Sequence, residues 1–112
     1  MIIYHNPRCR KSRETLEIIR KNDVEPEIIL YLEQPPNSEE IRDLVRLLGI
    51  PPEELVRKTE AIYKEQFKGR DLTEEEWIEA LSTYPKLMER PIVVEGDKAV
   101  IGRPPENVMA LL

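Results

Sequence analysis

The sequence contains one cysteine, Cys9, which lies in a strongly basic segment. Four cations are found within four positions of it: Arg8, Arg10, Lys11 and Arg13. Neighbouring positive charge favours the thiolate, which is the nucleophilic form of cysteine. A lone cysteine is more often a small buried hydrophobe, but these surroundings predict a reactive thiol. The same cations favour a small anion as the ligand, because arginine donates paired hydrogen bonds to oxyanions.

The single cysteine also limits the chemistry. The chain cannot form an internal disulfide, and a four-cysteine metal site is excluded. Cys9-Arg10-Lys11-Ser12 is a C-x-x-S segment, with serine where many thiol enzymes carry a second, resolving cysteine. An external thiol must therefore complete any redox cycle that begins at Cys9. We predict neither a metal site nor a tightly bound cofactor.

Two further residues near Cys9 are candidates for supporting roles. His5 is the only histidine, and it ends a short apolar segment. It could tune the thiolate, form a hydrogen bond with Ser12, or simply fix the loop, and the sequence does not choose among these. Ser12 lies near the start of an amphipathic segment, as the N-cap or in the first turn of a helix, and we expect its main role to be that of a helix cap.

The pattern of apolar residues and chain breakers predicts an α/β protein. The first three elements form a βαβ unit, and a helical block from about residue 35 to 85 follows it. We predict strands at 2–5, 28–32, 92–94 and 99–101, and helices at 12–22, 38–48, 60–66, 73–84 and 104–112. This order predicts one domain, residues 1–112, with a thioredoxin-like fold and a helical insertion between the second and third strands.

This arrangement places Cys9 in the loop between the first strand and the first helix. Backbone N–H groups at a helix start carry partial positive charge and stabilise a thiolate or an oxyanion. In thioredoxin-like folds a cis-proline before the third strand faces the active cysteine, and by this analogy we predict a cis bond at Arg90-Pro91. Arg103-Pro104 lies at a second strand-to-helix junction.

Composition excludes several other classes of protein. The net charge of −5 argues against a general nucleic-acid binder. The apolar runs are too short to span a bilayer, and the first residues carry no basic segment of a secretory signal. We therefore expect a cytoplasmic protein that binds neither nucleic acid nor membrane, and we expect a monomer.

These features together resemble the ArsC family, the glutaredoxin-linked arsenate reductases. The opening segment from Ile3 to Leu16 looks like the family's signature loop, and further similar segments follow in order along nearly the whole chain. They are Glu33-Gln34-Pro35-Pro36, Arg57-Lys58, Arg90-Pro91-Ile92-Val93-Val94 and Gly102-Arg103-Pro104-Pro105-Glu106. The chain ends at Leu112 with its last predicted helix and without the extended tail of longer members, so it resembles the compact branch of the family.

The resemblance implies a function and a site. It implies that Cys9 attacks arsenate and that Arg57, Arg90 and Arg103 bind and stabilise the oxyanion. It also places a histidine and a serine near the thiolate, at positions that match His5 and Ser12. Glutathione would be the co-substrate and glutaredoxin the partner that supplies electrons, with arsenite as the product.

Two alternatives remain open at this stage. One is a glutathione-dependent oxidoreductase that acts on another substrate, such as protein mixed disulfides. The other is a non-catalytic regulator, because Spx-type regulators share this fold and bind RNA polymerase. Those regulators usually carry a C-x-x-C switch, whereas this chain has C-x-x-S.

Overall fold

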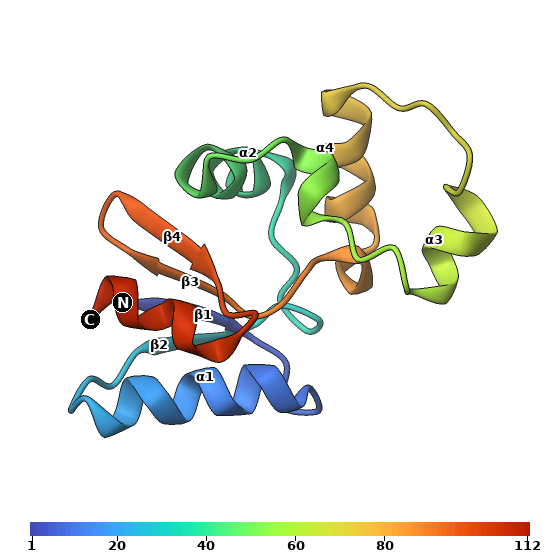
Figure 1. Cartoon of the computed structure of the whole chain (residues 1–112). Coiled ribbons are helices and arrows are strands. Elements are labelled where there is room, and N and C mark those ends of the chain that lie inside the picture. The colour runs from blue at the N-terminus through green and yellow to red at the C-terminus, as the bar shows by residue number, and fades with distance from the viewer. The chain divides into compact units, whose positions relative to one another are not determined.

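A four-stranded mixed sheet lies at the centre of the part of the chain that carries Cys9 (Figure 1). The computed structural model describes all 112 residues, which form two compact units. The first unit consists of Met1–Gln34 and Arg90–Leu112, and the second of Pro35–Glu89. The strand order is β2-β1-β3-β4, with β1 parallel to β2 and antiparallel to β3. The elements of the first unit are β1 (Ile2–His5), α1 (Arg10–Lys21), β2 (Glu27–Leu30), β3 (Ile92–Glu95), β4 (Lys98–Ile101) and the 3₁₀ helix η3 (Pro105–Leu111).

The core of the first unit follows from strand alternation and helix periodicity. Ile3 of β1 pairs with Val93 of β3, so both side chains point to one face of the sheet, which α1 and η3 cover (Figure 1). The buried stripe of α1 recurs at helical spacing. Its members are Ser12, Thr15, Leu16 and Ile19. The half of this stripe nearest Cys9 is polar and the other half is apolar, so the core ends where the basic loop begins.

Most predicted boundaries shift by one or two residues, and two of the differences have a clear local cause. Helix α1 begins at Arg10, and Cys9 is its N-cap residue, so Ser12 lies in the first turn and does not cap the helix. The second strand ends at Leu30, since the N–H groups of Glu33 and Gln34 both donate to the Leu30 carbonyl and close a turn. Hydrophobicity predicted a longer strand, but this turn chemistry ends it.

The second unit is helical, as predicted for the insertion. Two of its helices begin with a reciprocal capping box, at Asn37 and at Thr73. Trp77 lies at the centre of an aromatic cluster with Tyr63 and Phe67. The elements of this unit are α2 (Ser38–Leu48), η1 (Pro52–Leu55), α3 (Ala61–Gln66), α4 (Glu74–Thr83) and η2 (Pro85–Leu87).

The predicted fold class is confirmed. The order is β-α-β, helices, β-β and a final 3₁₀ helix, which is that of a thioredoxin-like fold with the helical insertion between the second and third strands. No helix is both long and apolar enough to cross a bilayer. The fold places the carboxyl end of β1, the start of α1 and the junction after β4 in one unit, and the candidate site is built from these.

Candidate active site

Cys9 is held at the start of α1 by a tight turn that follows β1. Its N–H donates to the Asn6 carbonyl at 3.0 Å, and the Asn6 Oδ1 accepts from the Arg8 N–H at 3.0 Å. Asparagine is suited to this turn because its side chain bonds to the backbone two residues on. Cys9 is half-buried, and its backbone at the helix start is extended.

The surroundings of the Cys9 thiol lower its pKa. Burial is the largest single influence and raises the pKa, because it disfavours the charged form. Hydrogen bonds from the Ser12 N–H and the Arg90 side chain, the charge of Arg90 and a bond from the Lys11 N–H together outweigh burial. The net shift is downward, so the thiolate is more populated at neutral pH than in an ordinary cysteine.

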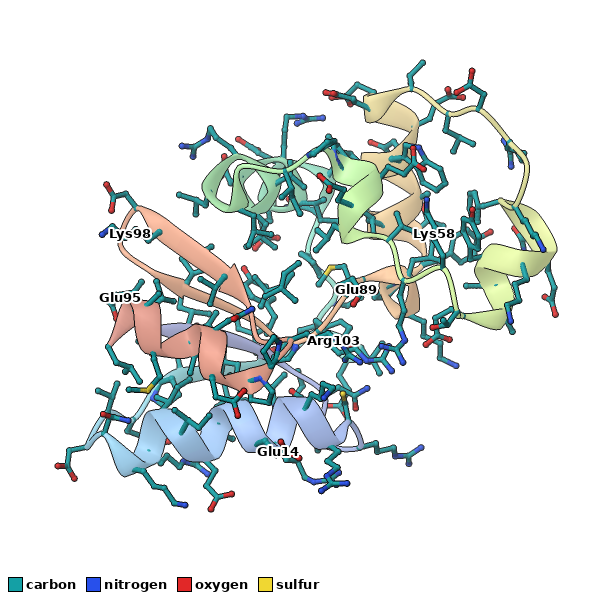
Figure 2. All side chains as sticks on the ribbon, viewed as in Figure 1. Glu14, Lys58, Glu89, Glu95, Lys98 and Arg103 are labelled. Carbon is teal, nitrogen blue, oxygen red and sulfur yellow. The ribbon has the colours of Figure 1, made fainter.

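Two of the predicted arginines lie beside Cys9. The Arg103 Nη1 lies 3.9 Å from the Cys9 Sγ, a long hydrogen bond to sulfur, and 3.1 Å from the Arg90 carbonyl to which it also donates. Figure 2 shows Arg103 directly after β4, at the edge of the sheet where α1 begins. The Arg90-Pro91 bond is cis, as predicted by fold analogy, and Arg103-Pro104 is cis as well, which was not foreseen.

The segment around Arg103 is fixed by close packing and by a side-chain bridge. The Gly102 N–H donates to the Pro91 carbonyl at 2.9 Å, and the Asn107 Nδ2 donates to the carbonyls of Ile101 and Arg103. A Cβ at Gly102 would lie 2.5 Å from the Thr15 Oγ1 and 2.8 Å from the Pro91 Cγ. Only glycine leaves room for this junction against α1.

Gly102→Ala should therefore destabilise the protein and displace Arg103. Thr15 is fully buried and cannot move away easily, so we expect a loss of about 1–3 kcal/mol from overpacking. Denaturant unfolding measures this loss. Thr15→Ala removes two of the three close atoms, so the double variant should cost less than the sum of the single changes. Strict additivity, or a Gly102→Ala protein as stable as the parent, would show that this contact is not limiting.

His5 and Ser12 form one buried network. The His5 Nδ1 lies 2.6 Å from the Ser12 Oγ in a hydrogen bond, and the Ser12 Oγ also accepts from the Asn6 N–H at 3.0 Å. Burial, with the charges of Arg20 and Arg13, lowers the pKa of His5, so the ring is neutral at neutral pH. The hydrogen bond between His5 and Ser12, one of the roles predicted for His5, is confirmed, and tuning of the thiolate by His5 stays a prediction. The cap predicted for Ser12 is wrong, because its hydroxyl bonds back to the strand end and the loop.

Arg57, the third predicted arginine, belongs to the second unit. Its N–H donates to the Leu87 carbonyl, next to the isolated bridge between Val56 and Met88. Its guanidinium pairs with Glu60, with the Nε 3.6 Å from the Oε1. The local backbone of Arg57 is thus well defined, and its part in binding an oxyanion stays a prediction.

The arrangement in the first unit suits attack by sulfur on an electrophile that carries negative oxygens. A thiolate with a guanidinium beside it supplies both the nucleophile and a partner for developing charge. Two residues that build this site, Asn6 and Gly102, were not among the predicted site residues. The Asn-Pro turn signal could have found Asn6. No local signal could have found Gly102, since its neighbour Thr15 is 87 positions away.

Comparisons with known proteins give consistent results. The sequence model of the ArsC family matches residues 4–111. The chain is 53% identical over 112 residues to the uncharacterised protein YfgD of Escherichia coli strain K12, covering 98% of this chain and 94% of YfgD. It is 42% identical to an arsenate reductase of Haemophilus influenzae, covering 100% of this chain and 98% of that protein. A solved arsenate reductase from Vibrio cholerae has a TM-score of 0.95 at 42% identity, covering 99% of this chain and 96% of that one.

These matches extend over nearly the whole chain, and they include the loop that carries Cys9 and the segments that carry the three arginines. The likeness to YfgD agrees with the compact branch expected from the sequence. The fold similarity to the Vibrio cholerae protein agrees with the strand order described above. The chain belongs to the ArsC family.

Proposed function

We propose that this protein is an oxidoreductase that reduces arsenate to arsenite, with Cys9 as the nucleophile. The observation that supports this most strongly is the half-buried thiol of lowered pKa with the Arg103 guanidinium 3.9 Å from its sulfur. Relatives named arsenate reductase match along the full chain, which supports the choice of substrate. The reducing glutathione pool that the cycle needs agrees with a cytoplasmic location.

The proposed cycle begins with the Cys9 thiolate and ends by regenerating it. The sulfur attacks arsenic(V), an S–As bond forms, and one arsenate oxygen takes up protons and leaves as water. Glutathione adds to the arsenic through its own sulfur, and a second water leaves. A glutaredoxin thiolate then attacks the glutathione sulfur, so that a mixed disulfide forms and the electron pair of the broken S–As bond reduces arsenic to the trivalent state. Water releases arsenite from Cys9.

The three arginines would stabilise the negative charge of arsenate from different positions. We propose that Arg90 and Arg103 hold arsenate oxygens beside the sulfur, since a guanidinium fork matches the spacing of two oxygens. Arg57 would contribute a third guanidinium, as the resemblance to the family implies. Charge that develops on oxygen during attack is then met by preorganised donors, which is the usual source of the largest rate gain.

A coupled assay tests the proposal. Purified protein is mixed with glutathione, glutaredoxin, glutathione reductase and NADPH, and NADPH oxidation is followed with and without arsenate. We expect oxidation only when arsenate is present, and none with sulfate, which has the same shape but is not reduced. No arsenate-dependent turnover together with rapid turnover of a glutathione mixed disulfide would contradict the proposal in favour of another oxidoreductase. Binding of RNA polymerase by inactive protein would favour the regulator.

A further inference from the structure

Three exposed cations next to Cys9 have no carboxylate partner. They are Arg8, Lys11 and Arg13, and we refer to them as the basic cluster. The side chains of Arg8 and Lys11 make neither an ion pair nor a hydrogen bond. Arg13 donates only to the Pro7 carbonyl, at 2.9 Å, which leaves its charge uncompensated.

The other cations of α1 differ in this respect. Arg10 pairs with Glu14 at 2.8 Å, and Lys21 pairs with Glu17 at 3.1 Å. Arg20 pairs with Glu25 at 3.0 Å. In a chain with 22 acidic and 17 basic residues, carboxylates are plentiful. The basic cluster is therefore a local positive field in an acidic protein, and such a field attracts anions from solution.

The surface around the loop has room for a small molecule. Arg8 lines a hollow of about 280 Å³ whose wall includes Leu30, Leu32 and Glu33. Arg13 lines a second hollow of about 500 Å³ along α1. The segment that leads to Cys9 contributes His5 and Pro7 to both hollows. Arg8 and Arg13 thus each line a hollow that borders the segment leading to Cys9.

The basic cluster differs in exposure from the guanidiniums proposed to hold arsenate. Arg103 is part-buried and bonded to the Arg90 carbonyl and the Cys9 sulfur, whereas the basic cluster is exposed. A second reactant must approach the thiol from solution, because Cys9 is the only cysteine. The exposed cations of the basic cluster therefore interact electrostatically with that reactant as it approaches.

We propose that the basic cluster favours reaction at the Cys9 site with thiol and disulfide co-substrates that carry carboxylates over reaction with uncharged ones. This inference deepens the proposed function and rests on its need for an external thiol. Attraction between the cluster and a carboxylate-bearing reactant raises the encounter rate, and it weakens as salt screens the charges. The charges of Arg8, Lys11 and Arg13 cause this selectivity, so it does not depend on which electrophile Cys9 attacks.

Thiol–disulfide exchange tests this without arsenate. Cys9 thiolate attacks one sulfur of a small disulfide, a mixed disulfide forms, and the other half leaves as a thiolate with the electron pair. Three probes differ in charge: oxidised glutathione is negative, hydroxyethyl disulfide is uncharged and cystamine is positive. Second-order rate constants for the mixed disulfide of Cys9 are measured by mass spectrometry at low and high salt, on the full chain.

The matched variants are Arg8→Gln with Lys11→Gln, and Lys98→Gln as the control. Lys98 begins β4 and lies at the end of the hairpin away from the Cys9 loop (Figure 2). We expect the rate ratio of oxidised glutathione to hydroxyethyl disulfide to fall about three- to tenfold in the double variant. The cystamine rate should rise, and Lys98→Gln should change neither. High salt should shrink the parent ratio toward that of the double variant.

An unchanged ratio in the double variant, or a parent ratio that salt does not alter, would overturn the inference. The arsenate assay separates its failure from failure of the proposed function. If the protein shows the charge selectivity but does not reduce arsenate, the inference about the basic cluster stands and arsenate is not the substrate. If the protein reduces arsenate without charge selectivity, the proposed function stands and the inference about the basic cluster fails.

Discussion

Cys9→Ser should abolish arsenate-dependent NADPH oxidation, with a loss of about 10³-fold or more. The serine hydroxyl fits the same space, but it does not ionise at neutral pH and so does not attack arsenic. No other cysteine can substitute for Cys9. The change is nearly isosteric, so the thermal unfolding curve should stay close to that of the parent, and the coupled assay should detect only the background rate.

Residual turnover in Cys9→Ser would contradict the central role of the sulfur. If the variant kept more than about a tenth of the parent rate, the accelerating groups would have to be the arginines alone. If Cys9→Ser binds arsenate as the parent does but shows no turnover, the result supports Cys9 as the nucleophile. Binding of arsenate to this variant is measurable by calorimetry.

Arg103→Ala should lower kcat/KM for arsenate by about 10²-fold, because one preorganised donor beside the sulfur is lost. Arg103→Lys should recover only part of the loss. A lysine keeps the positive charge, but its ammonium lacks the planar guanidinium fork that we propose holds two arsenate oxygens. Steady-state kinetics in the coupled assay measure both effects.

Arg90→Lys should act differently from Arg103→Lys. The Arg90 side chain is one of the groups that hold the Cys9 pKa down, by a hydrogen bond and by its charge. Its replacement should weaken turnover and also raise the thiol pKa. Arg46→Ala is the matched control for Arg103→Ala, since Arg46 is an exposed cation of α2 paired with Asp43. Equal losses in Arg103→Ala and Arg46→Ala would place the anion site elsewhere.

Most of the fold could be predicted from local patterns. Strand alternation, helix periodicity and the Thr73 capping box each depend on residues close in sequence. The errors arose where a local rule met a competing interaction. Serine is a residue type that commonly caps helices, yet the Ser12 hydroxyl forms hydrogen bonds with His5 and with the Asn6 N–H. The second strand was predicted too long because Tyr31 and Leu32, the first two residues of the turn after Leu30, are apolar as well.

The candidate site could be predicted only in part. A thiol in a basic strand-to-helix loop is visible in the sequence, and the cis bond at Pro91 followed from fold analogy. The position of Arg103 beside Cys9 depends on contacts between residues far apart along the chain. Gly102 packs against Thr15 and Pro91, and no pattern within a short window records such a contact. The pairing of Arg57 with Glu60 is likewise a structural finding.

The rate of Cys9 alkylation by iodoacetamide as a function of pH tests the central claim most directly. Only the thiolate reacts, so the rate rises as pH increases through the thiol pKa and then reaches a plateau. Because hydrogen bonds and Arg90 lower this pKa despite burial, we predict a midpoint below that of an ordinary cysteine. A midpoint at or above that value, or a thiol that the reagent does not reach, would contradict the account.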